Sequence, residues 1–246
     1  MNLTGAELQV GVDEEIPSSA PLRLGGENVW LLWQLADSAF PTGGFAHSGG
    51  LEAVWQHREV RGGEELAECL RTALTQLAHG ALPFVHATHS RAGDFADVDA
   101  WCDAFNSNHV TNRASRLQGQ SLLASAEKIF AQSDLTAFRR SVAEQNLPGH
   151  AAPVWGAVAR LLGLEVDATA RLFVFTHLRG WISAAVRLNI VGPLEGQRVQ
   201  HQLAPTAESV ARRFGEISME NAAQTAPLLD LWQGTQDRLY SRLFQT

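Results

Sequence analysis

Residues 31–52 read LLWQLADSAFPTGGFAHSGGLE, and this stretch sets the organisation of the chain. Its leucines and alanines first recur at helical spacing, until Pro41 and the glycines that follow it interrupt the pattern. Glycines such as Gly43, Gly44 and Gly50 adopt backbone angles that other residues avoid. The stretch therefore predicts a helix, a tight loop and a second helix.

The second helix of this unit is expected to begin just after Ser48. The Ser48 hydroxyl can accept hydrogen bonds from backbone amides about one turn further on, near Leu51 and Glu52. An acidic side chain such as Glu52 in a first turn also suits the helix dipole. His47 fits either a general base or a side chain that closes the loop by hydrogen bonding. The residues that we expect to shape the loop are Pro41, Gly43, Gly44, His47, Ser48, Gly50 and Glu52.

A glycine-rich loop ahead of a helix also suggests phosphate binding. A phosphate-binding loop needs a preceding β-strand and a Lys-Ser or Lys-Thr pair after its glycines, and this stretch has neither. Saturable GTP binding by the isolated protein is therefore not expected.

The composition is that of a folded, acidic protein. With 246 residues and 45% hydrophobic content, the chain can bury a substantial core. The formal net charge of -7 argues against nucleic acid as a partner, because neutralising phosphates requires a clustered basic surface. Cys69 and Cys102 each lie in a helical pattern, so we expect buried thiols and neither a disulfide framework nor a zinc site.

The sequence shows neither the N-terminal pattern of a targeting segment nor the apolar stretch of a membrane span. The N-terminus lacks a basic start followed by an apolar core, and no stretch offers about eighteen uninterrupted apolar residues. We therefore predict a soluble, cytoplasmic protein without a membrane partner. Residues 1–26 mix glycine, proline, serine and acidic residues, which predicts a flexible acidic tail ahead of one domain over residues 27–246.

Helical periodicity continues through the rest of the chain. It predicts helices at about 64–77, from 83, 97–110, 113–130, 134–145, 153–162, from 167 or 169 to 191, 197–214, and from 227 towards the C-terminus. The helix that begins near Asp167 is apolar on nearly all sides and should be central. No stretch shows convincing strand alternation. The pattern predicts an all-α, single-domain bundle of about ten helices around that central helix.

Two pairs of side chains suggest chemistry. His86 and His89 lie three residues apart on a predicted helix and can share one face, but two ligands do not complete a metal site. An all-α enzyme or metal-binding protein that uses His47, His86 and His89 stays open as an alternative. Arg113 and Arg116, also three apart, fit either a solvated helix face or a clamp for carboxylates.

Two groups of residues, the tryptophans and the C-terminal run, fit either the core or an interface. Trp30, Trp33, Trp55 and Trp181 are expected in the core, although a tryptophan near a loop also makes a good interface anchor. The C-terminal run consists of Tyr240, Ser241, Arg242, Leu243 and Phe244. It combines two aromatic rings, an aliphatic side chain and an arginine, which is typical of an interface anchor. Alternatively, its last two apolar side chains close the core.

The order DSAFPTGGFAHSGGLE in residues 37–52 resembles the opening signature of the UreF family of urease accessory proteins. Further stretches match the family pattern in the same order, at residues 111–123, 150–156, 181–187, 196–198 and 240–244. The resemblance covers about residues 31–244. The end of the chain departs from it, with Phe-Gln-Thr where the family usually has Phe-Arg-Ser, and with Gln236 and Asp237 in place of the usual His-Glu.

The resemblance implies an all-α homodimer that binds the accessory protein UreD, also called UreH. Through that complex it would recruit the GTPase UreG and deliver nickel to the urease apoprotein. It implies a scaffold and not an enzyme, with no tightly bound cofactor and nickel only in transit. Residues 240–244 and the Arg113 and Arg116 face would bind partners, the tail being flexible or loosely docked until it does. A UreF paralogue outside the urease pathway is a further alternative.

Overall fold

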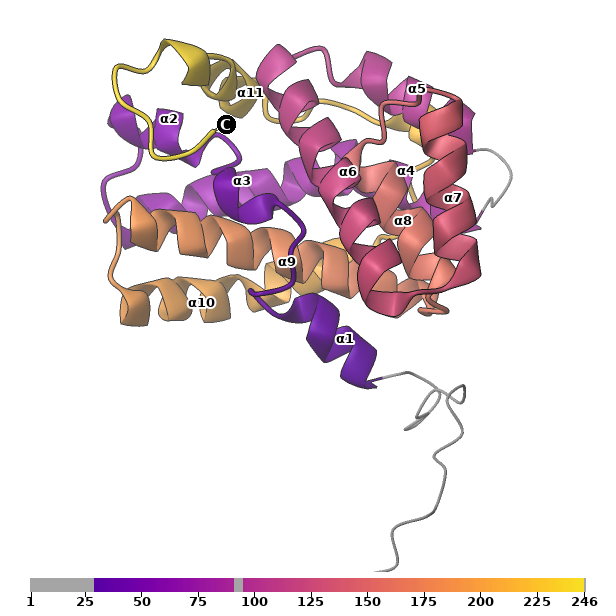
Figure 1. Ribbon diagram of the computed structural model, residues 1–246. Helices are drawn as coiled ribbons and strands as arrows, with labels where there is room; N and C mark the ends of the chain where they lie inside the picture. The colour runs from indigo at the N-terminus through magenta and orange to yellow at the C-terminus, as the bar shows by residue number, and fades with distance from the viewer. Residues whose placement is uncertain (1–28, 91–94, 246) are drawn as a thin grey trace, which may run out of the picture.

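The computed structural model describes residues 29–90 and 95–245 (Figure 1). The predicted N-terminal tail, residues 1–26, lies outside the described residues. The described part is all-α, as the sequence predicts, and it contains no strand. None of its helices is long and apolar enough to cross a bilayer.

The described residues form eleven α-helices and three short 3₁₀ helices. In chain order they are α1 (Val29–Ala36), η1 (Gly44–Ala46), α2 (Leu51–Gln56), α3 (Gly63–Gly80), α4 (Leu82–Ser90), α5 (Phe95–Phe105), α6 (His109–Phe130), α7 (Ser133–Glu144), α8 (Ala151–Leu161), α9 (Val166–Arg187), α10 (Pro193–Arg212), η2 (Met219–Asn221), α11 (Pro227–Gly234) and η3 (Gln236–Arg238).

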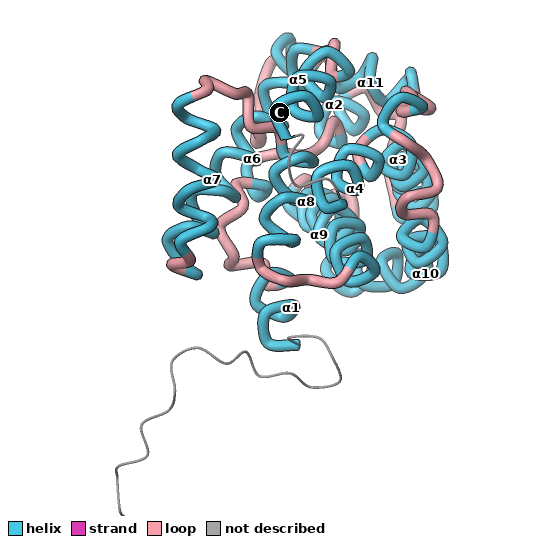
Figure 2. The backbone as a smooth tube through the Cα atoms, turned by 90° about the vertical axis from the view of Figure 1, so that its right-hand side faces the viewer, coloured by secondary structure: helices cyan, strands magenta, loops and turns pink. Residues whose placement is uncertain are grey.

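Helix α9 lies at the centre of the bundle. It packs along α10 and also contacts α1, α2, α3, α4 and α8. Leu172, Phe173, Val174, Leu178 and Ile182 on α9 are all buried. Figure 1 shows α9 and α10 side by side, with α4 to α8 grouped at one end of the pair, and Figure 2 shows the same grouping from the side. The predicted central apolar helix is confirmed.

Two predicted helix boundaries are wrong. The helix predicted over 97–110 ends at Phe105, and α6 begins at His109 because the Asn108 side chain accepts a hydrogen bond from the Val110 amide at 3.0 Å. Asn108 also donates to the Asp230 carbonyl at 2.7 Å and so links α6 to α11. Helix α11 ends at Gly234, and the chain then runs through η3 into an irregular C-terminal segment.

Three of the four tryptophans expected in the core are exposed. The exposed fractions of Trp30 and Trp33 are 60% each and that of Trp55 is 38%, whereas Trp181 is half-buried. Helix α1 is eight residues long and packs on the outside of α9. It buries Leu31 and Leu35 there, so its opposite face, with both tryptophans, points to solvent.

Helix α8 fits tightly between α4 and α6 because glycines stand at the contacts. A β-carbon on Gly156 would overlap the Val85 carbonyl oxygen and the Thr88 hydroxyl of α4. Thr88 uses that hydroxyl to donate to the Pro153 carbonyl at 2.8 Å. On the other side, a β-carbon on Gly119 of α6 would overlap the chain just before α8. Helix α8 can lie this close only without side chains at these points.

We predict that Gly156→Ala lowers the free energy of unfolding by about 1 to 3 kcal/mol, because the added methyl group overpacks the contact with α4. Denaturant unfolding measures the change. Gly180→Ala is the matched control, since a β-carbon there meets nothing within 4 Å. It lies on a helix, where alanine is favoured over glycine, so its effect should be neutral or stabilising. Equal effects of the two substitutions would contradict the packing argument.

Candidate interaction site at the signature loop and the C-terminal segment

The signature loop, residues 37–50, is fastened to α6. The Pro41 carbonyl accepts hydrogen bonds from the Ser121 and Ser125 hydroxyls at 3.3 and 2.8 Å. At the start of the loop, the Asp37 carboxylate accepts from the Ala39 amide at 2.9 Å, which turns the chain away from α1. Since the rigid helix α6 holds its middle, the loop has a defined course.

Three glycines of the loop require backbone angles that favour glycine. Gly43, Gly49 and Gly50 have φ values of 78°, 63° and 90°. A β-carbon on Gly49 would also overlap the Trp181 indole nitrogen. Gly44 is not in the left-handed region, so its backbone angles do not require glycine, contrary to expectation. The requirement applies to Gly43, Gly49 and Gly50.

The hydrogen bond predicted at Ser48 is confirmed, although the N-cap position of α2 is Gly50, and Glu52 lies in the first turn of α2 as expected but also has a role that was not predicted. Ser48 is fully buried, and its hydroxyl accepts from the Glu52 amide at 3.3 Å. The Glu52 side chain is only 2% exposed. Its carboxylate accepts from the backbone amides of Leu243 and Phe244 at 2.6 and 3.1 Å and from Gln236 Nε2 at 2.7 Å. All three donors belong to the C-terminal segment, residues 235–245.

Further hydrogen bonds join the C-terminal segment to the signature loop and to α2. The Gln245 amide donates to the Ala46 carbonyl at 2.8 Å, and Gln56 Nε2 donates to the Ser241 carbonyl at 2.8 Å. Phe244 is 3% exposed and belongs to the core. The expectation of a flexible or loosely docked tail therefore differs from the structure. Apolar burial and the buried Glu52 carboxylate hold the end of the chain in place.

An arginine from the central helix completes this junction. The Arg187 guanidinium lies 3.8 Å from the centre of the Phe45 ring and 4.2 Å from that of Phe244. It also donates to the Phe45 carbonyl at 2.5 Å. A cation between two aromatic faces attracts both rings, so α9 connects the signature loop to the C-terminal segment.

The outer side of the C-terminal segment presents apolar side chains to solvent. Tyr240 is fully exposed, and Leu243 is 53% exposed. Arg242 pairs with the Asp237 carboxylate at 3.2 Å, within the same segment. The five residues predicted as a partner-binding run thus divide into a buried anchor, Phe244, and an exposed surface.

Arg113 and Arg116 do not act together as a clamp. The Arg113 guanidinium forms two hydrogen bonds with the Asp237 carboxylate, at 3.1 and 2.8 Å, and His109 Nε2 lies 3.2 Å from the same group. The hydrogen bonds from Arg113 lower the pKa of Asp237, so this carboxylate stays ionised. Arg116 is exposed, and its charge acts on Asp103. Arg113 therefore fastens the C-terminal segment to α6.

The structure does not bring His47, His86 and His89 together as a metal site. Within residues 29–90 and 95–245, no three side chains from His, Cys, Asp and Glu are grouped to hold a metal ion. His89 is buried with Nε2 3.0 Å from the Leu164 carbonyl, and the His86 ring packs edge-on against Phe214. Burial raises the pKa of the Cys69 thiol to about 11.

His47 instead lines a cavity of about 680 Å³ between the signature loop, α6, α8 and α9. Trp155, His177 and Trp181 line the same cavity. His177 Nδ1 lies 2.8 Å from the Phe173 carbonyl, and the Trp155 indole nitrogen is buried with no hydrogen-bond partner among the described residues. Burial lowers the pKa of both His47 and His177, so both rings are neutral at neutral pH.

These features define the class of protein: an all-α bundle in which an N-terminal loop and the C-terminal segment form one surface unit. Comparison with known proteins identifies the family. The UreF family model matches residues 60–204. The chain belongs to the UreF family, which confirms the resemblance found in the sequence.

Curated relatives cover most of the chain. The chain is 37% identical to "Urease accessory protein F" of Oryza sativa subsp. indica over 237 residues, which is 95% of this chain and 90% of the relative. It is 39% identical to "Urease accessory protein F" of Arabidopsis thaliana, over 87% of this chain and 91% of the relative. A bacterial relative, "Urease accessory protein UreF" of Arthrobacter sp. (strain FB24), is 27% identical over 87% of this chain and 96% of its own length.

We predict that Glu52→Ala lowers the free energy of unfolding by about 2 to 4 kcal/mol, because it removes the acceptor of the Leu243 and Phe244 amides and the nearer of two acceptors of Gln236 Nε2. Protease cleavage near the C-terminus should also become faster. The matched control is Glu64→Ala, at an exposed position in the first turn of α3. If both variants unfold at the same denaturant concentration, the carboxylate does not hold the C-terminal segment.

Stability should also fall in mild acid. An unfolded histidine has a pKa near the ordinary 6.5, whereas folding lowers the pKa of His47 and His177. The unfolded chain thus binds more protons, so this stabilisation is complete above pH 6.5 and is lost as the pH falls below it. We expect the unfolding midpoint to drop between pH 7.5 and about 5.5, and the drop to be smaller in His177→Gln. An equal drop in His177→Gln and in the wild type would contradict this account.

Proposed function

We propose that this protein is a scaffold for urease maturation. It binds UreD (UreH), recruits the GTPase UreG through that complex and so brings nickel to the urease apoprotein. Membership of the UreF family supports this role, and the relatives' names, which describe accessory proteins, suggest a non-catalytic one. The chain acts as a cytoplasmic homodimer, holds no tightly bound cofactor, and meets nickel only in transit.

The observation that carries the proposal is the anchored C-terminal segment. Glu52 and the core hold Phe244, while Tyr240 and Leu243 remain exposed on the outside of the same short segment. Tyrosine is among the side chains that dominate binding energy at interfaces. A segment that is already ordered loses less conformational entropy when a partner binds. This arrangement suits a docking site for UreD.

The alternatives lack comparable support. An enzyme or metal site built on His47, His86 and His89 would need these side chains to converge, and among the described residues His89 already contacts the Leu164 carbonyl at 3.0 Å. A paralogue outside the urease pathway would share this fold. Restoration of urease activity in cells that lack their own UreF distinguishes it from a urease accessory protein.

The binding test separates the exposed side chains from the buried anchor. We expect the double variant Tyr240→Ala and Leu243→Ala to lose co-purification with UreD and urease activation, because interface anchors typically contribute about 2 kcal/mol or more each. Its melting temperature should match that of the wild type, since both side chains are exposed.

Phe244→Ala is the contrasting variant. It should lower the free energy of unfolding by about 3 to 5 kcal/mol, as truncation of a buried phenylalanine does. Removing all of residues 240–246 mixes the two effects, so this truncation should destabilise the protein as well as remove the exposed side chains. Undiminished UreD binding by the double variant would place the UreD interface elsewhere.

A further inference from the structure

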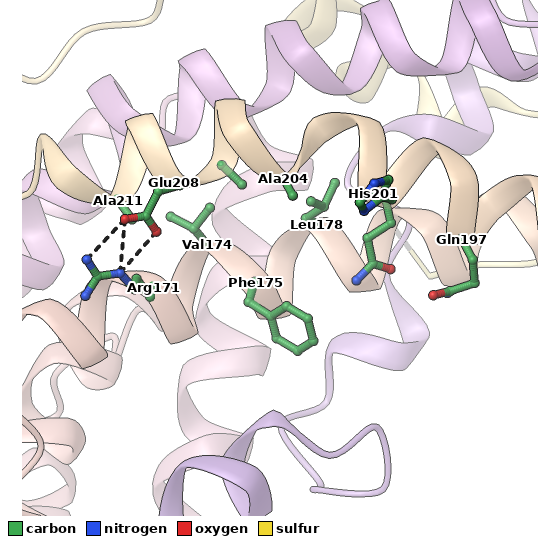
Figure 3. Close-up of a pocket in the computed structure, with 11 residues that line it drawn as sticks. Arg171, Val174, Phe175, Leu178, Gln197, His201, Ala204, Glu208 and Ala211 are labelled. Carbon is green, nitrogen blue, oxygen red and sulfur yellow. Dashed lines mark hydrogen bonds and ion pairs between the residues drawn. The ribbon is translucent and has the colours of Figure 1, made fainter. Parts of the chain in front are cut away.

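A groove runs along the outside of the central helix pair, between α9 and α10 (Figure 3). Its volume is about 420 Å³. The α10 side is built from small side chains, Ala204, Ala207 and Ala211, and the α9 side from larger apolar ones. Phe175 projects from α9 and is 39% exposed. Arg171 and Glu208 pair across one end at 3.1 Å, Gln197 and His201 lie at the other end, and the stretch between them is lined by apolar side chains such as Val174 and Leu178.

The groove holds an unpaired polar atom. Gln200 lines it, and the Gln200 Oε1 atom is buried with no hydrogen-bond donor among the described residues. A buried carbonyl without a donor typically costs 1 kcal/mol or more, so such atoms mark places where a further group binds. An occupant of this groove should therefore be apolar and carry a hydrogen-bond donor.

The same chain carries a matching ridge. Trp30 and Trp33 stand on the outer face of α1, 60% exposed each, with their ring centres 5.1 Å apart in an edge-to-face pair. No described residue accepts a hydrogen bond from either indole nitrogen. A tryptophan buried at an interface usually finds a partner for its N–H group, and Gln200 Oε1 is such a partner.

The ridge and the groove lie on one side of the molecule. Helix α1 packs on α9, which also forms one wall of the groove. Arg179 of α9 joins them, since it donates to the Ala36 carbonyl at the end of α1 at 2.6 Å and lies 6.0 Å from the centre of the Phe175 ring. In a two-fold dimer both copies use the same patch, which must therefore be self-complementary. A ridge beside a groove meets that requirement.

We propose that this face, formed by α1, α9 and α10, binds a second copy of the chain. Trp30 and Trp33 of each copy enter the α9–α10 groove of the other, and an indole N–H donates to Gln200 Oε1. This inference rests on the proposed homodimer and specifies the surface through which the two copies bind. Two tryptophans at this exposure offer roughly 300 Å² per copy, a large part of the ~800 Å² per partner in a typical stable interface.

Sedimentation of the full chain at tens of micromolar tests the proposal. The wild type should sediment as a dimer. Trp33→Glu removes the ridge and adds a charge, while Ala204→Arg fills the groove. Each should weaken the dimer at least 100-fold and give monomer, with unchanged circular dichroism because both positions are exposed. Leu228→Glu, at a 68% exposed position on α11, is the matched control and should remain dimeric.

A cross-linking measurement complements the two variants. Trp33→Cys protein mixed with Ala204→Cys protein should form a disulfide between copies under mild oxidation, whereas Trp33→Cys mixed with Leu228→Cys should not. A monomeric wild type would overturn both the homodimer and this surface. A dimeric wild type whose variants stay dimeric and do not cross-link would leave the homodimer standing and overturn the surface. If the wild type is monomeric and UreD alone shields residue 33 from chemical modification, the face binds UreD.

Discussion

The hydrogen bonds of the buried Glu52 carboxylate are the interactions on which the attachment of the C-terminal segment depends. A carboxylate without water is strongly unfavourable unless donors surround it. Among the described residues it accepts from three donors of the C-terminal segment, the amides of Leu243 and Phe244 and the side chain of Gln236. The start of α2 and the C-terminal segment thus depend on each other. If they separate, the Glu52 carboxylate loses these donors and the donors lose their acceptor.

Gln236 and Asp237, at which the sequence is expected to depart from the usual family ending, both contribute to this attachment. Gln236 is fully buried and donates to Glu52, a contact that a neutral amide makes without adding a second buried charge. The neighbouring Asp237 faces outwards, and its carboxylate forms ion pairs with Arg113 of α6 and with Arg242 of the same segment. The departures from the usual His-Glu therefore lie at contacts that fasten the C-terminal segment, and they do not leave it loose.

Much of the fold could be predicted from the sequence because its determinants are local. The periodicity of α9 predicts a central helix, and the Ser48 hydroxyl accepts from an amide four residues away at the start of α2. The role of Glu52 could not be predicted in this way, since its partners lie 184 to 192 residues further along the chain. The exposure of Trp30 and Trp33 could not be predicted either. A short helix with two apolar faces does not indicate which face packs against the bundle.

Helix α9 contacts both the α1 face and the junction of the signature loop with the C-terminal segment. Through Arg179 it holds the end of α1, and through Arg187 it holds the signature loop and Phe244. Eight residues of α-helix separate these arginines by about 12 Å along the axis. Figure 1 places α1 and the C-terminus on opposite sides of the bundle. A second copy on the α1 side, as proposed, would therefore leave the C-terminal side accessible, and the central helix α9 would hold the two proposed surfaces at a fixed separation.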